Sequence, residues 1–150
     1  VSSDKDFLQL QKYKGVAQYS PMQKKLLIET NPEVALREKI IRGDGGDGIP
    51  TIHCKDTKFT DPDGTRAKSI TKQWLAEVLR APNIEEMLTE EEKKGYVRNQ
   101  RLIDLSFIPK EISQNIVEAY NSYVPPKKSG VYSYLNDKGY VNLVDMLEHF

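Results

Sequence analysis

The spacing of apolar residues along the chain predicts a mostly helical protein. The clearest pattern begins at about Thr65 and ends at Pro82, because apolar residues recur there with the 3.6-residue period of an amphipathic helix and proline stops it. We expect this apolar face to be buried in the core, with its tryptophan serving as a packing anchor rather than as a platform for base stacking. The residues of the face are Ile70, Trp74, Leu75, Val78 and Leu79.

Capping residues mark the starts of two further helices. Asn31 and Pro32 suit the N-cap and the first position of a helix over residues 32–41. Thr89 and Glu92 are three residues apart and form a capping box, which predicts the start of a long helix. Both helices therefore have starting points that local sequence defines.

The N-terminal region is expected to hold shorter elements. Ser3 or Asp4 can cap a short helix that runs to about Tyr13. Residues 16–19 and 25–28 read as two short strands, because they are rich in β-branched and aromatic side chains.

The C-terminal region predicts one longer helix and two short ones. Pro109 begins the longer helix, whose Ile112, Ile116 and Tyr120 are expected to face inward. The tail reads as two short helices separated at Gly139. We expect the aromatic side chains of the tail to be buried against the helices before it.

Residues 42–50 interrupt the helical pattern with four glycines and two aspartates. Glycine adopts backbone conformations that other residues avoid and lets a phosphate or another backbone approach closely. An EF-hand calcium loop counted from Asp44 needs an acidic twelfth residue, and Lys55 stands there, so this kind of site is rejected. Two alternatives stay open, a turn that binds a ligand and a solvated turn whose aspartates only cap backbone amides.

Composition leaves aspartate as the available chemistry. One cysteine excludes an internal disulfide framework and a cysteine-rich zinc site, and two histidines give little material for acid–base catalysis. Asp4 and Asp6 follow Val1, which looks like the end of a strand, and this is the usual ligand position in a parallel α/β sheet. Being two residues apart, they could serve two neighbouring cations, or they could be an N-cap and a surface charge.

The formal net charge is zero, but the charges are segregated along the chain. Eight cations lie from Arg37 to Lys72, whereas five glutamates and no cation lie from Asn83 to Glu92. A basic stripe is compatible with phosphate contacts, although such runs are usually solvated faces. No apolar run approaches the roughly 20 residues of a membrane helix, and no signal peptide is recognised.

Two acidic motifs, residues 2–7 and 43–50, together resemble the paired motifs of the 5′-nuclease (flap endonuclease) superfamily. Within it the chain is most similar to the ribonuclease H branch of T-even phages. Supporting pieces are residues 19–22, 102–104, 108–109, 121–123 and 132–134. The resemblance covers the C-terminal half of such an enzyme.

The resemblance implies an α+β, mostly α fold in two parts. Residues 1–31 would be the trailing edge of an α/β nuclease domain with a parallel sheet. Residues 32–150 would form a helical DNA-binding domain with a helix–three-turn–helix element around the glycine-rich turn.

The resemblance also implies a magnesium-dependent enzyme with two metal ions, in which Asp4, Asp6, Asp44 and Asp47 are catalytic metal ligands. Asp4 would belong to an ion shared with an N-terminal half that supplies further carboxylates. Asp6 and Asp47 would hold the second ion, partly through water, with Asp44 nearby. The present chain alone would then be inactive.

The expected substrates are the 5′ ends of RNA–DNA and DNA duplexes, and flapped or forked DNA. Cleavage would proceed 5′ to 3′ and remove primers during lagging-strand replication in the cytoplasm of an infected bacterium. Potassium is the expected occupant of backbone carbonyls in the turn, and a phage single-strand-binding protein is the candidate protein partner.

The alternative function is a duplex-binding module without chemistry of its own. The expected DNA-binding residues are Arg42, Gly43, Gly45, Gly46, Gly48, Ile49, Lys55, Lys58, Arg66, Lys68 and Lys72.

Overall fold

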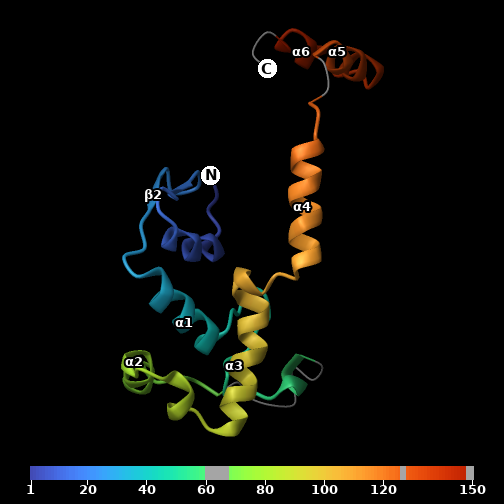
Figure 1. The fold of residues 1–150 in the computed structure, drawn as a ribbon. Helices are drawn as coiled ribbons and strands as arrows, with labels where there is room; N and C mark the ends of the chain where they lie inside the picture. Colours follow the sequence, from blue (N-terminus) through green and yellow to red (C-terminus); the bar gives the residue numbers. More distant parts are fainter. Residues whose placement is uncertain (60–67, 126–127, 148–150) are drawn as a thin grey trace. The chain divides into compact units, whose positions relative to one another are not determined.

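A computed structural model describes residues 1–59, 68–125 and 128–147 (Figure 1). The chain forms two compact units, residues 1–108 and 109–150. Helices dominate the described residues, and their one sheet has two antiparallel strands. The mostly helical class is therefore confirmed, while the parallel sheet of a preceding nuclease domain stays a prediction.

The first unit begins with a short helix and a hairpin, as the sequence predicted. The 3₁₀ helix η1 spans Lys5–Lys12, and the Asp4 side chain caps it by accepting a hydrogen bond from the Asp6 amide at 2.9 Å. Strand β1, Gln18–Ser20, pairs with β2, Lys25–Leu27, so that the two strands form a small ladder beside η1.

Helix α1 spans Pro32–Arg42, and the Asn31 side chain caps it as predicted. The helix ends at Gly43, where φ is +71° and an added Cβ would collide with the Ile49 carbonyl oxygen. This position therefore requires glycine for both backbone conformation and space. The Asp44 and Ile49 backbones exchange two hydrogen bonds of 2.9 and 2.7 Å, which close the glycine-rich turn.

Helix α2 spans Lys72–Arg80, so the prediction that it begins near Thr65 is wrong. The reason is local: Thr71 is extended, and its hydroxyl accepts a hydrogen bond from the Trp74 amide, which starts the helix there. Residues 60–67, including the predicted turn at residues 61–64, lie outside the described part of the chain. A 3₁₀ helix, η2, spans Asp56–Phe59 before this gap.

Helix α3, Glu90–Ile103, begins with the predicted capping box between Thr89 and Glu92. Short 3₁₀ helices flank it, η3 at Ile84–Met87 and η4 at Leu105–Phe107. The apolar core lies between α1, α2, α3 and the segment after the turn, and it confirms the predicted role of the α2 face. Its buried members are Ile41, Ile52, Leu75, Val78 and Leu88, with Ile70, Trp74, Leu79, Ile84 and Tyr96 packed against them.

The second unit consists of α4, Lys110–Ser122, α5, Lys128–Asp137, and α6, Val141–Val144. Gly139 separates α5 from α6 as predicted. Ile112, Ile116 and Tyr120 on α4 are 51%, 61% and 81% exposed, so the expectation that they face inward is wrong within this unit. No described element of the unit covers this apolar face.

The tail aromatics are likewise exposed, contrary to expectation. Tyr132, Tyr134 and Tyr140 are about half exposed, because α5 and α6 bury little beyond Leu135 in their contact with each other. None of the described helices has the length and apolar character needed to cross a membrane.

Replacing Gly95 with alanine tests how closely α3 approaches the segment after the turn. A Cβ at Gly95 would lie 2.8 Å from the Ile52 Cα and closer still to its carbonyl oxygen, and backbone atoms cannot rotate away. We expect Gly95→Ala to lower the free energy of unfolding by about 2 kcal/mol or more, measured by urea denaturation. Gly45→Ala is the control, since Gly45 has room for a Cβ and should change stability by about 0.5 kcal/mol or less. Equal effects of the two substitutions would refute the close-packing argument.

Candidate metal centre

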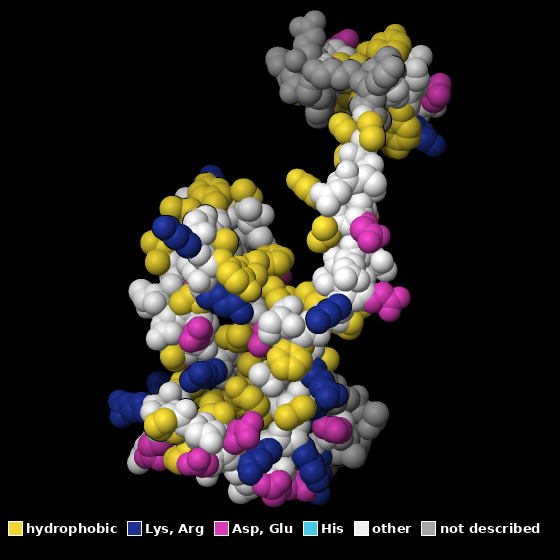
Figure 2. Space-filling view, in the orientation of Figure 1, with side chains coloured by type: hydrophobic (Ala, Val, Ile, Leu, Met, Phe, Trp, Pro, Cys, Tyr) yellow, Lys and Arg dark blue, Asp and Glu magenta, His cyan; other side chains and the backbone are white. Residues whose placement is uncertain are grey.

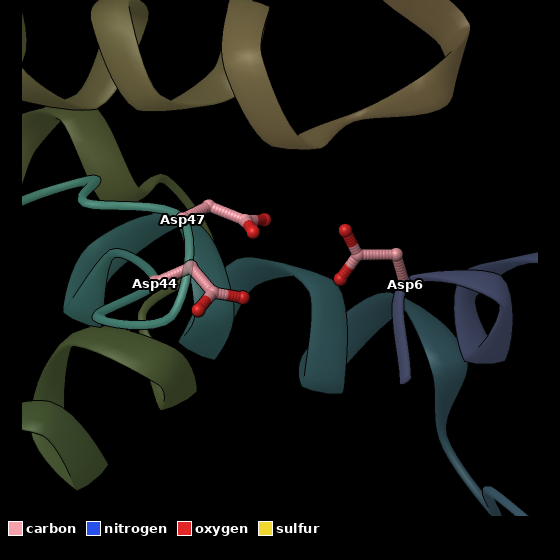
Figure 3. Close-up of side chains that lie close together, drawn as sticks. All are labelled: Asp6, Asp44 and Asp47. Carbon is pink, nitrogen blue, oxygen red and sulfur yellow. The ribbon is translucent and has the colours of Figure 1, made fainter. Parts of the chain in front are cut away.

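Three carboxylates from two distant segments meet in the first unit. Asp6 lies on η1, whereas Asp44 and Asp47 lie on the turn after α1, and one oxygen from each lies within 4.8 Å of the others. Figure 3 shows Asp6 directed toward the two turn aspartates. Asp6 and Asp44 are partly exposed and Asp47 is exposed, so the cluster opens to solvent.

The turn is fixed from behind by two neighbouring residues of α3. The Asn99 side chain is completely buried, and its amide nitrogen donates to the carbonyl oxygens of Ile40 and Pro50, each at 2.8 Å. These carbonyls flank the turn on both sides, so one side chain sets the distance between its two ends. Arg98 continues the scaffold by donating to the backbone carbonyls of Thr51 and Cys54.

The position of η1 depends on a buried glutamine. Gln9 is 5% exposed, and its amide nitrogen donates to the Asp6 carbonyl at 2.9 Å and to the Ile103 carbonyl at 3.1 Å. Its oxygen accepts from the Leu105 amide at 3.0 Å. Helix α3 thus holds η1 through the carbonyl of Ile103, its last residue, and holds the turn through the Asn99 side chain. These contacts bring Asp6 close to the turn aspartates.

Lys39 of α1 places an ammonium group between two of the carboxylates. Its Nζ forms ion pairs with Oδ1 of Asp6 and, at 2.8 Å, with Oδ2 of Asp44. The Asp44 Oδ1 also accepts a hydrogen bond from the Gly46 amide at 2.9 Å. The Lys39 contact, followed by the Gly46 amide, lowers the pKa of Asp44 below its usual 3.8.

Asp4 is not part of this group of three. Its carboxylate caps η1, although Asp4 lines the same open cleft as Asp6, Lys39 and Asp44. Of the four aspartates expected to bind metal, the structure therefore brings three together and leaves the fourth at the edge of the cleft.

The donor set of the cluster suits a magnesium ion. Magnesium prefers hard oxygen ligands and keeps several waters, so two or three carboxylates open to solvent fit its requirements. Asp6, Asp44 and Asp47 are the described residues that would hold it, provided that the Lys39 ammonium gives way on the shared oxygens.

Several of the residues expected to bind DNA line one of two clefts of the first unit. Lys55, Lys58 and Lys68 line a cleft of about 440 Å³ together with Lys94 of α3. Arg42 lines the carboxylate cleft instead, and it forms an ion pair with Glu38 at 2.7 Å.

The remaining candidates lie on the turn, at the start of α2, or outside the described chain. Gly43, Gly45, Gly46, Gly48 and Ile49 belong to the turn, Lys72 is exposed at the first position of α2, and Arg66 lies outside the described residues. On the face shown in Figure 2, basic and acidic side chains of the first unit are interspersed rather than gathered into one stripe.

Sequence reasoning missed the residues that organise the cluster. Lys39 had no signal beyond its charge, because its partners lie on separate segments. Asn99 carried a weak one: Gly95, Asn99 and Ile103 recur every four residues, which places a polar side chain on the buried face of a helix.

The lowered pKa of Asp44 predicts a specific dependence of stability on pH. Because the folded-state pKa lies below the unfolded value near 3.8, Asp44 stabilises the fold above that pH and loses its contribution as the pH falls through the folded value. Without metal ions, Asp44→Asn should therefore lower stability at pH 7, by about 1 kcal/mol or less for a pair that is partly exposed to solvent, and match the parent chain at the acid end. Thermal unfolding in EDTA from pH 7 to 2.5 measures this, and a constant difference at every pH would contradict it.

Two comparisons with known proteins bear on this arrangement. A family model described as "T4 RNase H, C terminal" matches residues 30–150. The whole chain is also 35% identical to a protein named "Ribonuclease H" from Enterobacteria phage T4 over 154 residues. The chain spans about half the length of that relative. The resemblance to this branch of nucleases is thereby confirmed, and the chain belongs to the T4 RNase H C-terminal family.

Proposed function

We propose that this chain is the C-terminal part of a magnesium-dependent 5′–3′ nuclease that hydrolyses RNA–DNA and DNA duplexes from the 5′ end. The observation that carries the proposal is the cluster of Asp6, Asp44 and Asp47, assembled from the same two motifs that resemble the 5′-nucleases. The relationship to a ribonuclease H supports a hydrolase of nucleic acids as the general class.

The chain's own residues provide one side of a two-metal centre. Bound in pairs about 4 Å apart, magnesium ions can generate hydroxide and stabilise the leaving oxygen in phosphodiester cleavage. Asp6 and Asp47 would orient one ion partly through water, with Asp44 beside them. Asp4, at the edge of the cleft, would face an ion shared with carboxylates outside this chain.

The domain boundary is part of the same proposal. Residues 1–31, with η1 and the hairpin, would be the trailing edge of a catalytic domain. Residues 32–150 would be the helical DNA-binding domain, in which α1, the glycine-rich turn and α2 form a helix–three-turn–helix element. The match of the family model from residue 30 onward is compatible with this division.

Duplex binding would use the turn and the lysine-lined cleft. Gly45 has no atom within 4 Å of an added Cβ, so a phosphate can approach its backbone. The separate lysine-lined cleft contributes ammonium groups from three segments of the chain, residues 55–58, Lys68 and Lys94, and its wall also includes Asp56, Glu91 and Glu92. Phosphate contacts of this kind position a duplex without reading its sequence. A potassium ion on backbone carbonyls of the turn would complete the site.

The proposed cellular role follows from the substrates. Removal of RNA primers and flaps during lagging-strand synthesis would occur in the cytoplasm of an infected bacterium. A phage single-strand-binding protein is the proposed protein partner. A second candidate function is a duplex-binding module that lacks catalysis when isolated, and the position of Asp4 outside the three-carboxylate group favours it.

Binding without cleavage is the expected behaviour of this chain alone. We expect it to retard a 5′-labelled flap duplex in magnesium and in calcium, with no product in either, because the three-carboxylate group supplies ligands for one ion. Binding is read by gel shift and cleavage by denaturing gel from the same samples. Cleavage in magnesium that is lost in Asp6→Asn would show that these carboxylates suffice. Absence of both binding and cleavage would refute the proposed function.

The salt dependence of binding tests the lysine cleft. If Lys55, Lys58 and Lys68 contact phosphates, replacing all three with glutamine should weaken binding and reduce the slope of log K against log salt by about 2 to 3. Titrations of a blunt duplex at several potassium chloride concentrations measure the slope. The control carries the same charge change at exposed lysines of the N-terminal segment, Lys12, Lys14 and Lys25. If both triple variants lose the same binding affinity and the same salt slope, net charge alone explains the effect. That result would contradict specific contacts in the cleft.

A further inference from the structure

Lys39 places a positive charge directly at the carboxylate cluster. Lys39 pairs with Asp6 and Asp44, whose positions are 38 residues apart in the chain, and its side chain is only 23% exposed. By contrast, Lys93 pairs with Glu90, which is four-fifths exposed on the same helix, as is usual for surface pairs. A lysine shared by two carboxylates of separate segments is therefore placed by the tertiary fold.

The charges explain why a cation is required there. Three carboxylates and one ammonium leave the cluster with a formal charge of −2. Without Lys39, three like charges would lie within 4.8 Å of one another with no described cation between them, and their repulsion would favour separation of η1 from the turn.

We infer that Lys39 is a built-in counter-ion that competes with divalent metal for Asp6 and Asp44, and so sets the metal affinity of the cluster. The inference rests on the proposed metal site. The competition is geometric, because the ammonium contacts Oδ1 of Asp6 and Oδ2 of Asp44, while the other oxygen of Asp44 already accepts from Gly46. An ion that binds these carboxylates must displace the ammonium or share its oxygens, and it experiences a repulsive charge at close range.

The same arrangement couples metal binding to nucleic-acid binding. The Lys39 side chain lines the open cleft together with Arg42 and Lys5, so an incoming phosphate can attract its ammonium away from the carboxylates. A phosphate that draws Lys39 away strengthens metal binding, and by linkage the metal strengthens binding of the phosphate. Lys39 would thus act as a positioning residue that keeps the empty centre assembled and favours metal loading when substrate is present.

Metal binding by lysine variants tests this directly. The probe is Mn²⁺ titrated by calorimetry into the metal-free chain, with no nucleic acid present. We expect Lys39→Met to bind Mn²⁺ about tenfold or more tightly than the parent chain, because the repelling charge is gone. Lys39→Arg should stay close to the parent, since it keeps the charge. Lys93→Met is the matched control: it removes one lysine charge from an ion pair away from the cluster and should leave Mn²⁺ affinity unchanged.

Coupling and folding are measured on the same proteins. A short duplex should raise the Mn²⁺ affinity of the parent chain and raise that of Lys39→Met much less. In EDTA, Lys39→Met should have a lower melting temperature than the parent chain. Added Mn²⁺ should raise the melting temperature of Lys39→Met more than that of the parent, so that the difference between them becomes smaller. If Lys39→Met does not fold, Lys39→Gln replaces it, because glutamine keeps a polar stem and removes the charge.

The outcomes separate this inference from the proposed function. Suppose that the parent binds Mn²⁺, that Asp47→Asn does not, and that Lys39→Met and Lys39→Gln bind Mn²⁺ no more tightly than the parent. The proposed metal site is then supported, and the competition by Lys39 is refuted. If neither the parent nor the Lys39 variants bind Mn²⁺, both the metal site and the competition are overturned. If Lys39→Met and Lys39→Arg both bind Mn²⁺ more tightly than the parent, packing rather than charge is responsible. This result also contradicts the inference.

Discussion

The arrangement of the first unit depends on one buried side chain, Asn99 of α3. Its amide satisfies two carbonyl oxygens, those of Ile40 and Pro50, that enclose the glycine-rich turn and have no helical partner there. A buried polar group of this kind stabilises only the geometry that satisfies it. Loss of the Asn99 donor would remove the printed partner of the buried Ile40 carbonyl, whereas the Pro50 carbonyl also accepts from Arg98 at 3.4 Å. Gly95, one turn earlier, lets α3 approach Ile52 closely enough for the contact to form.

The acidic cluster shows how a fold can hold like charges together. Backbone hydrogen bonds and the anchors of Gln9 and Asn99 place the carboxylates, and Lys39 offsets part of their repulsion. The two contributions support each other, since a scaffold without a cation is opposed by repulsion and a cation without a scaffold would hold exposed aspartates only weakly. The proposed chemistry uses the same balance, because a centre that must accept and release metal needs carboxylates that are fixed but not fully neutralised.

The second unit differs from the first in having little core of its own. Its longest helix, α4, keeps an apolar face exposed, and its tail buries little beyond Leu135. Amphipathic spacing correctly identified the helix, but no described element of its own unit covers the apolar face that was expected to be buried. The period of apolar residues specifies which side of a helix is apolar, whereas the partner that covers this side depends on other parts of a protein.

The sequence by itself determined the helices, their caps and the likeness to 5′-nucleases, since these depend on residues close together in the chain. Asn31 and Thr89 act within a few residues, so local chemistry sufficed to predict them. The start of α2 was misplaced because Thr71 supplied a cap that the apolar period does not show. The likeness to 5′-nucleases implied that Asp6 and Asp47 share an ion with Asp44 nearby, and the structure shows how close the three carboxylates lie. The contact of Lys39 with Asp6 and Asp44 was visible only in the tertiary structure. These contacts join segments almost 40 residues apart, and their geometry follows from how α1 and α3 pack.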